Sequence, residues 1–157
     1  MNIMSYSDQY KNQIISLILH IQNDEARINL SVEEQPDLLD INKSYIEGGG
    51  NFWLAFDNGQ VIGTIALMNY GNHNAVLKKF FVREDYRSQK VGLKLYKKFH
   101  EWAEEQGFKI ILLDTPSVAT ASHRFYEKNG FIRIAKRSIP FEYTYPDRDS
   151  YLYMLHL

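Results

Sequence analysis

A polar turn between two apolar segments holds the residues with the clearest chemical potential in this sequence. It reads YRSQKVG and contains Arg87, Lys90 and Gly92. An aromatic and β-branched run precedes it at 75–82 and an amphipathic run follows at 91–106, so the turn connects a predicted strand to a predicted helix. The first turn of a helix offers backbone N–H groups without intrahelical acceptors at the positive end of the helix dipole, and a phosphate interacts favourably with both. With two cationic side chains and a glycine that permits close approach, the turn predicts a phosphate site.

Motif spacing limits the other kinds of site that the sequence can hold. It contains neither GxxxxGK[ST] nor GxGxxG, so the two common nucleotide-binding fingerprints are absent. For the turn alone, a solvated connector between strand and helix is an equally good interpretation, because short motifs of this kind often match by chance. The five histidines lack HxxxH and HExxH spacing and there is no cysteine, so no metal site is predicted.

A second candidate segment, SVATASHRFYEKNGF at 117–131, predicts a helix that ends at Asn129-Gly130. Ser122 and Tyr126 are i, i+4 neighbours and therefore share a face of that helix. The Tyr126 hydroxyl could point into the same cleft as the phosphate turn. The alternative is a half-buried packing residue, since the chain has eleven tyrosines.

The elements that must position these residues follow the order β-α-α-β-β-β-α-β-α-β-β. Asn58-Gly59 favours a tight hairpin between the second and third strands. The β-α-β unit around the turn makes its two strands parallel, or splayed neighbours, in one mixed sheet. Ligands bind such sheets where neighbouring strands diverge at their carboxyl ends. The predicted strands are 2–7, 51–56, 60–67, 75–82, 109–114, 131–137 and 150–157, and the predicted helices are 8–21, 37–46, 91–106 and 117–129.

Length and composition favour a single domain that spans residues 1–157. The net charge is −1, so the electrostatic footprint of a protein that binds duplex nucleic acid is missing. The absence of cysteine excludes a disulfide framework and a thiolate nucleophile. No apolar run has the length of a membrane span and the first residues do not read as a signal peptide, so we expect a cytoplasmic protein without a membrane partner.

Taken together, the two segments resemble the GNAT superfamily of acyl-coenzyme A-dependent N-acetyltransferases. The family's phosphate turn, [RQ]-x-x-G-x-[GA], is similar to the RSQKVG run at 87–92, with Lys90 in place of the middle glycine. The family's second signature, a helix that ends in lYekxGF, is similar to RFYEKNGF at 124–131. The resemblance covers 74–131 well. It implies a GNAT-like α/β (α+β) fold: a mixed, largely antiparallel twisted sheet of about seven strands, with helices on both faces and a splayed parallel strand pair.

The resemblance also implies a cofactor and a set of site residues. Acetyl-coenzyme A would be the co-substrate, with its pyrophosphate on the N–H groups at the start of the helix and its pantetheine arm along the preceding strand, one of whose N–H groups would polarise the thioester carbonyl. Tyr126 resembles the tyrosine that protonates, or donates a hydrogen bond to, the departing thiolate, which has a parent pKa of about 8.5. The residues that the resemblance assigns to cofactor binding are Phe80, Phe81, Val82, Arg87, Ser88, Gln89, Lys90, Val91, Gly92, Leu93, Ser117, Ser122 and Phe125.

Two further positions depart from the family pattern. Val76 stands where many relatives carry a glutamate that accepts the proton of the amine, and Ala119 stands where an asparagine is often found. The sequence therefore supplies no general base at the usual position.

The acceptor is expected to be a small-molecule or peptide amine, and its proton must be removed. A lysine-like amine with a pKa of about 10.4 is almost wholly charged at neutral pH. His73 lies in the turn before the predicted strand at 75–82 and is a possible proton acceptor, with a loop histidine of no catalytic role as the alternative. Acidic candidates from the variable region, with a solvated acidic loop as the alternative, are Asp24, Glu25, Glu33 and Glu34. Aromatic residues that could line the acceptor pocket, or else form a dimer contact or a strand edge, are Phe141, Tyr143, Tyr145 and Tyr151.

Three functions are compatible with these features. The leading one is an N-acetyltransferase that moves an acetyl group to a primary amine by direct attack in a ternary complex. The alternative is a non-catalytic acyl-coenzyme A-binding or sensing module, which the residues at 76 and 119 make plausible. A nucleic-acid module is the weakest of the three because the net charge is near zero. A homodimer and the length of the acyl group both stay open.

Overall fold

The centre of the molecule is a seven-stranded sheet. The computed structural model describes residues 1–145 and 149–157, and its strands lie in the spatial order β1-β2-β3-β4-β5-β7-β6. Each neighbouring pair is antiparallel except β4 and β5, which are parallel. This confirms the predicted mixed, largely antiparallel sheet with one parallel pair. The strands are β1 Asn2–Ser5, β2 Asn51–Asp57, β3 Gln60–Gly71, β4 Asn74–Val82, β5 Ile110–Pro116, β6 Ile132–Ile134 and β7 Ser150–His156.

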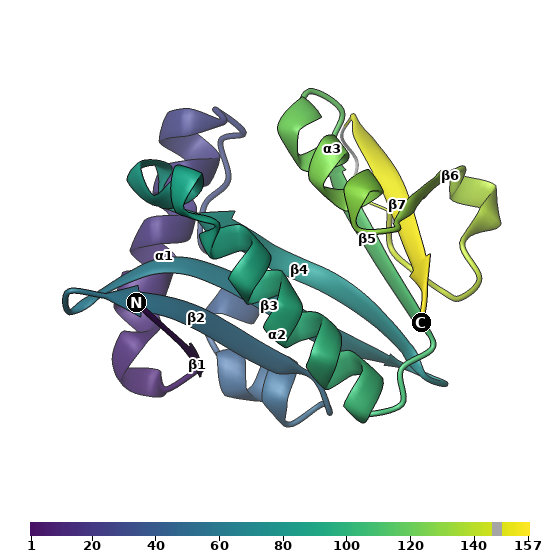
Figure 1. Ribbon diagram of the computed structural model, residues 1–157, viewed down its shortest axis with the longest axis horizontal. Coiled ribbons are helices and arrows are strands. Elements are labelled where there is room, and N and C mark those ends of the chain that lie inside the picture. Colours follow the sequence, from purple (N-terminus) through teal and green to yellow (C-terminus); the bar gives the residue numbers. More distant parts are fainter. Residues whose placement is uncertain (146–148) are drawn as a thin grey trace.

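Helices cover both faces of the sheet, as the sequence predicts (Figure 1). One face carries α2, Val91–Glu105, and α3, Thr120–Lys128, whose apolar side chains join one large core cluster with the strands. The other face carries α1, Lys11–Leu19, which contributes to a second cluster with β2 and β3. None of the helices in the described part of the chain is long and apolar enough to cross a membrane.

The α2 helix follows directly from its sequence periodicity. Val91, Leu95, Phe99 and Ala103 recur at helical spacing and are all buried. The helix ends before Gly107, which has a φ of 84° that glycine adopts without a steric penalty. The buried face anchors α2 on the sheet, and its N-terminus follows the polar turn at the end of β4.

Several element boundaries differ from the sequence prediction. The predicted helix at 37–46 is two short helical turns, Pro36–Leu38 and Asn42–Ile46. The helix predicted from 117 begins at Thr120, because Pro116 still pairs with Ser150 as the last residue of β5. These differences move boundaries by a few residues and leave the order of the strands and of the long helices unchanged.

A third apolar cluster corrects one prediction about the acceptor side. Phe141, Tyr143 and Tyr145 pack against Val76 and Leu112 on the sheet, on the face opposite α2 and α3. They are therefore partly buried packing residues of the described chain and not a wall of the cleft described below. Tyr151 lies on the other face, where Arg133 stacks on its ring at 3.3 Å.

Candidate active site

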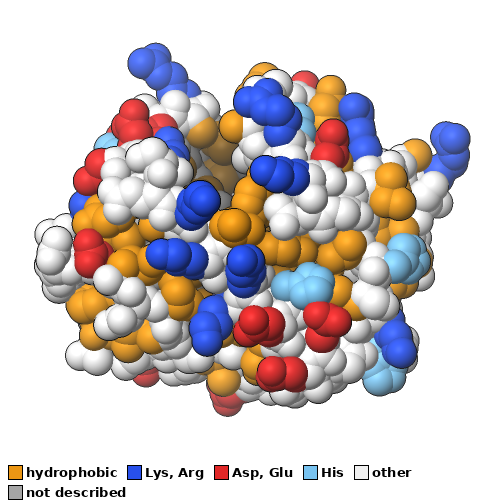
Figure 2. Space-filling view, viewed as in Figure 1, with side chains coloured by type: hydrophobic (Ala, Val, Ile, Leu, Met, Phe, Trp, Pro, Cys, Tyr) orange, Lys and Arg blue, Asp and Glu red, His pale blue; other side chains and the backbone are white. Residues whose placement is uncertain are grey.

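The strands β4 and β5 diverge where the two sequence motifs meet. They pair only through residues 74–76 and 110–112, whereas β4 continues to Val82 and β5 to Pro116. A cleft of about 680 Å³ lies at this opening. Figure 2 shows the hollow at the top of the view, between the two halves of the molecule. Its volume is in the range of small-molecule sites, about 300–1,000 Å³.

A β-bulge in β4 shapes one side of the cleft. Thr64 pairs with Phe81 and Ala66 pairs with Lys78, so the two residues between them on β4 face a single residue of β3. Lys79 lies in the bulge with a φ of 52°, and the Thr64 hydroxyl donates a hydrogen bond to the Lys79 carbonyl oxygen at 2.7 Å. Because a bulge bends the strand and interrupts its ladder, it contributes to the divergence of β4 from β5.

The phosphate turn forms the start of α2. A 3₁₀ turn, Glu84–Gln89, leads to Lys90, which has left-handed angles (φ 60°, ψ 24°) at the N-cap, and no side chain caps the helix. This conformation explains why the family motif has glycine at the Lys90 position. Gly92 lines the cleft, and a Cβ built on it would lie 3.6 Å from Phe80. The uncapped first turn of α2 thus borders the cleft, as a phosphate site requires.

Arg87 lines the cleft and is already engaged within the protein. Its Nε donates to the Val82 carbonyl oxygen at 2.9 Å, and one terminal nitrogen donates to Glu25 Oε1 at 2.5 Å. Glu25 ends the π-helical turn His20–Glu25, which continues α1. The ion pair links the turn before α2 to the end of the helical segment that continues α1, so a phosphate bound by Arg87 would compete with Glu25.

Tyr126 is held on the opposite side of the cleft by aromatic packing. The side chain is only 7 % exposed, and its ring centroid lies 5.6 Å from Phe131 and 6.0 Å from Tyr153. Burial raises the pKa of the Tyr126 hydroxyl well above its ordinary value, and the charge of Asp114 adds to that effect. The hydroxyl therefore keeps its proton at neutral pH and can act only as a neutral donor or acceptor.

The predicted site residues fall into three groups. Those that line the cleft are Phe80, Phe81, Val82, Arg87, Gly92, Ser122, Phe125 and Tyr126. Ser88, Gln89 and Lys90 are exposed on the adjacent turn, and Leu93 follows them on α2. Val91 is buried in the core, and the Ser117 hydroxyl donates to Asp149 at 2.5 Å.

The acceptor candidates from the sequence lie in different places. Glu34 lines the cleft and accepts hydrogen bonds from the backbone and side chain of Ser31. Glu33 is exposed, and Asp24 binds His20 at 2.8 Å. His73 lies in the turn that begins β4, at the opposite end of the strand from the cleft, so it cannot serve as a proton acceptor there.

A polar network along the cleft was not predicted. Gln22 and Gln35, both 5 % exposed, exchange hydrogen bonds at 2.8 and 2.9 Å. The Lys79 ammonium donates to Gln35 at 2.6 Å and lies 3.6 Å from Asp37. These four residues line the cleft, but glutamines in a polar loop and a lysine in a strand give no sequence signal for such a contact.

Asp114 is a second residue that sequence reasoning missed. It lines the cleft from β5, and Tyr143 donates a hydrogen bond to one of its carboxylate oxygens. Asp114 ends the apolar run KIILLD, next to the predicted divergence of the strands. A carboxylate at the carboxyl end of a buried strand was the signal that could have identified it.

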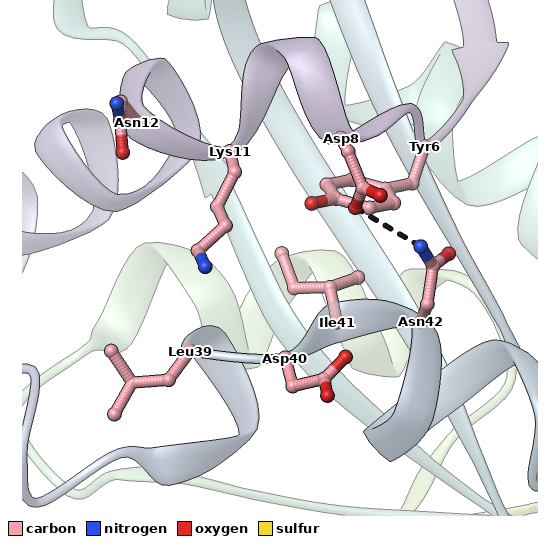
Figure 3. Close-up of a pocket in the computed structure, with 8 residues that line it drawn as sticks. All are labelled: Tyr6, Asp8, Lys11, Asn12, Leu39, Asp40, Ile41 and Asn42. Carbon is pink, nitrogen blue, oxygen red and sulfur yellow. Dashed lines mark hydrogen bonds between the residues drawn. The ribbon is translucent and has the colours of Figure 1, made fainter.

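A second hollow lies away from the cleft (Figure 3). It measures about 510 Å³, and Tyr6, Asp8 and Asn42 are among the residues that line it. Asn42 donates to Asp8 at 3.0 Å across this hollow, and burial together with Asp8 raises the pKa of Tyr6. It shares no lining residue with the cleft. Within residues 1–145 and 149–157, no group of His, Asp and Glu side chains could hold a metal ion.

Sequence and structure comparisons define the class of the protein. The family model described as "Acetyltransferase (GNAT) family" matches residues 15–131. The chain therefore belongs to the GNAT acetyltransferase family, which uses acetyl-coenzyme A as its acetyl donor. This confirms the resemblance that the sequence motifs indicated.

Individual relatives agree with this assignment. The crystal structure of an acetyltransferase from Streptococcus agalactiae is 38 % identical and superposes with a TM-score of 0.96, covering 99 % of this chain and 98 % of that one. The PaiA N-acetyltransferase of Thermoplasma acidophilum, solved in complex with coenzyme A, shares the fold at 18 % identity with a TM-score of 0.78 and full coverage of both chains (100 % each). The "Probable N-acetyltransferase camello" of Xenopus tropicalis is 31 % identical over 107 residues, which is 66 % of this chain and 49 % of that protein. The chain spans about half the length of the curated relatives it matches.

Proposed function

We propose that this protein transfers an acetyl group from acetyl-coenzyme A to a primary amine, by direct attack of the amine in a ternary complex. The observation that carries the proposal is the cleft between β4 and β5, with the uncapped start of α2 on one side and Tyr126 on the other. Phosphate binding and leaving-group protonation need these two features, and one continuous cleft contains both.

The residues of the cleft fit coenzyme A. The first turn of α2 offers N–H donors to a diphosphate, and Arg87 adds a cationic donor beside it. The edge of β4 beyond Val76, which does not pair with β5, is suited to hydrogen bonds with an extended amide chain such as pantetheine. Ser150 also lines the cleft, and its hydroxyl is buried without a hydrogen-bond partner among the described residues, as expected of a group that binds a ligand.

The reaction divides between the two sides of the cleft. Acetyl-coenzyme A supplies an acyl carbon bonded to a thiolate leaving group. A backbone N–H of residues 80–82 would polarise the carbonyl, and the amine nitrogen forms the new C–N bond as the C–S bond breaks. The Tyr126 hydroxyl donates its proton to the departing sulfur; burial keeps that proton in place until the thiolate develops, although it makes the phenol a weaker acid.

The binding or sensing module is the less favoured alternative. The relatives described above are named as acetyltransferases, and Tyr126 lies in the cleft where a leaving group would need it. A single domain over 1–157, a cytoplasmic location and a homodimer stay expectations.

Two measurements test the proposal. Acetyl-coenzyme A should raise the melting temperature by mass action, by an amount that grows with its concentration. A thiol-release assay over a panel of primary amines should then detect turnover. A shift in melting temperature without thiol release from any amine would favour the sensing module, and the absence of both would refute the proposal.

A further inference from the structure

The acceptor amine needs a proton acceptor that β4 does not supply. Val76 is only 1 % exposed and packs in an apolar cluster. The carboxylates that line the cleft among the described residues are Glu34, Asp37 and Asp114. Glu34 accepts two hydrogen bonds from Ser31, and Asp37 accepts one from Tyr45 at 2.5 Å and lies near Lys79. Asp114 is the remaining carboxylate.

The register of the sheet places Asp114 close to the position of Val76. Val76 pairs with Leu112 in the last rung of the β4–β5 ladder, and both side chains lie in the same cluster. Alternate residues of a strand share a face, so Asp114 lies on the face of Val76 and Leu112, one step further along β5. That step takes it past the last rung and into the open end of the cleft.

The surroundings of Asp114 suit a proton acceptor. Tyr143 donates a hydrogen bond to Asp114 Oδ2, whereas Oδ1 accepts no hydrogen bond from the described residues. The Tyr143 ring is itself fixed, with its centroid 5.8 Å from that of Tyr70 on β3. One oxygen is therefore held in place, and no donor among the described residues competes with a substrate for the other.

Asp114 is close enough to Tyr126 to act on it electrostatically. Burial raises the pKa of Tyr126 on α3 and that of Tyr70 on β3, and the charge of Asp114 adds to both effects. Among the described residues, the titratable groups that face Asp114 are thus Tyr143, Tyr70 and Tyr126, and Lys78 of β4 lines the same cleft. A carboxylate and a protonated phenol that line one cleft can serve as the proton acceptor and the proton donor of an acid–base reaction.

We propose that Asp114 is a catalytic residue that binds the acceptor as its ammonium cation and accepts the proton, with Tyr143 as the positioning residue for the carboxylate. This inference rests on the proposed acetyl transfer and names the base for it. A proton passes from the ammonium nitrogen to Asp114 Oδ1, the freed lone pair forms the C–N bond, the C–S bond breaks, and the sulfur takes the proton of Tyr126. The new amide nitrogen then loses its second proton, which replaces the one that Tyr126 gave to the sulfur, and solvent removes the proton from Asp114, so one proton is released for each amide formed.

The pH profile of Asp114→Asn tests this role. The substitution keeps the size of the side chain and removes its ability to accept a proton. With a primary amine of pKa about 10 and saturating acetyl-coenzyme A, we expect turnover at pH 7 to fall by about 10²–10⁴-fold. The unprotonated amine increases about tenfold for each pH unit below its pKa, so the ratio of wild-type to variant turnover should shrink as the pH rises from 7 to 9.5. The ligand-induced shift in melting temperature should equal that of the wild type.

Two other variants complete the experiment. Tyr143→Phe removes only the hydroxyl and should give a smaller loss of kcat with the same pH dependence and an unchanged KM for acetyl-coenzyme A, so it tests the role even where Asp114→Asn does not fold. Glu127→Gln is the matched control, because Glu127 also accepts a tyrosine hydroxyl, from Tyr153 at 2.6 Å, and does not line the cleft. It should keep wild-type turnover at every pH.

The outcomes separate this role from the function on which it rests. Suppose that the wild type releases thiol, but that Asp114→Asn lowers turnover by the same factor at every pH or by no more than Glu127→Gln does. This result would overturn the role of Asp114 and leave acetyl transfer standing. Absence of thiol release by the wild type would overturn both.

Discussion

Replacement of Tyr126 by phenylalanine should separate catalysis from stability. The ring contacts with Phe131, Phe80 and Tyr153, at centroid distances of 5.6, 6.3 and 6.0 Å, are kept. The hydroxyl makes no hydrogen bond to the described residues, so its loss should change the free energy of unfolding by less than about 0.5 kcal/mol. For a chain of this size that is a shift in melting temperature of less than about 2 °C.

The same substitution should have a large effect on turnover. A hydrogen bond to a charged partner is worth about 1.5–3 kcal/mol. Loss of that stabilisation from the transition state corresponds to a decrease in kcat of about 10- to 150-fold, with little change in the KM for acetyl-coenzyme A. Because burial raises the pKa of Tyr126, its hydroxyl stays protonated throughout the accessible pH range, and the ratio of wild-type to variant kcat should be constant from pH 7 to 9.5. A constant ratio distinguishes it from the Asp114→Asn variant.

Tyr153→Phe is the matched control for this prediction. Its hydroxyl donates to Glu127 at 2.6 Å, so the substitution should lower the free energy of unfolding by about 1 kcal/mol and the melting temperature by about 2–4 °C. Its kcat should equal that of the wild type, since Tyr153 does not line the cleft. The assays are thiol release and thermal denaturation of each variant. Turnover of Tyr126→Phe within twofold of the wild type would refute the assignment of the proton donor.

Three further predictions concern the elements that form the cleft. Lys90→Gly should raise the melting temperature by about 2–4 °C, because the left-handed angles of Lys90 cost about 1 kcal/mol for a residue with a Cβ. Lys90→Ala keeps the Cβ and should leave the melting temperature unchanged. An equal increase for both variants would contradict this explanation. Arg87→Ala should weaken coenzyme A binding by about 10-fold and reduce its salt dependence in calorimetric titrations at two ionic strengths; unchanged affinity would show that Glu25 retains the guanidinium. Thr64→Val should lower the free energy of unfolding by about 1–2 kcal/mol, measured by denaturant titration, because it removes the 2.7 Å hydrogen bond to the Lys79 carbonyl; a neutral effect would mean that the bulge does not depend on it.

Local sequence signals predicted the features that lie within one element or one turn. The spacing of Val91, Leu95 and Phe99 defined α2, and the polar turn before it marked the carboxyl end of β4. The order of elements then required the parallel pair, since a β-α-β crossover brings its strands side by side. The fold and the position of this turn could therefore be predicted from the sequence, and the binding of a phosphate there stays a prediction.

Contacts between distant residues were not predictable in the same way. Asp114 and Tyr143 lie 29 residues apart, and nothing in the aromatic run at 139–145 shows that it packs on the sheet and supports a carboxylate. The left-handed conformation of Lys79 likewise depends on β3, because the bulge exists only in the register of the two strands. Sequence periodicity identifies which face a residue occupies but not which distant side chain meets it there.

The three-rung ladder between β4 and β5 has a mechanical consequence. The sheet consists of two well-paired parts, β1–β4 and β5–β7, joined through residues 74–76 and 110–112. An acetyl-coenzyme A molecule bound between β4 and β5 would contact both parts and reduce their motion relative to each other. Hydrogen exchange at the outer halves of β4 and β5 should therefore slow when the donor binds, whereas exchange within β2 and β3 should stay the same.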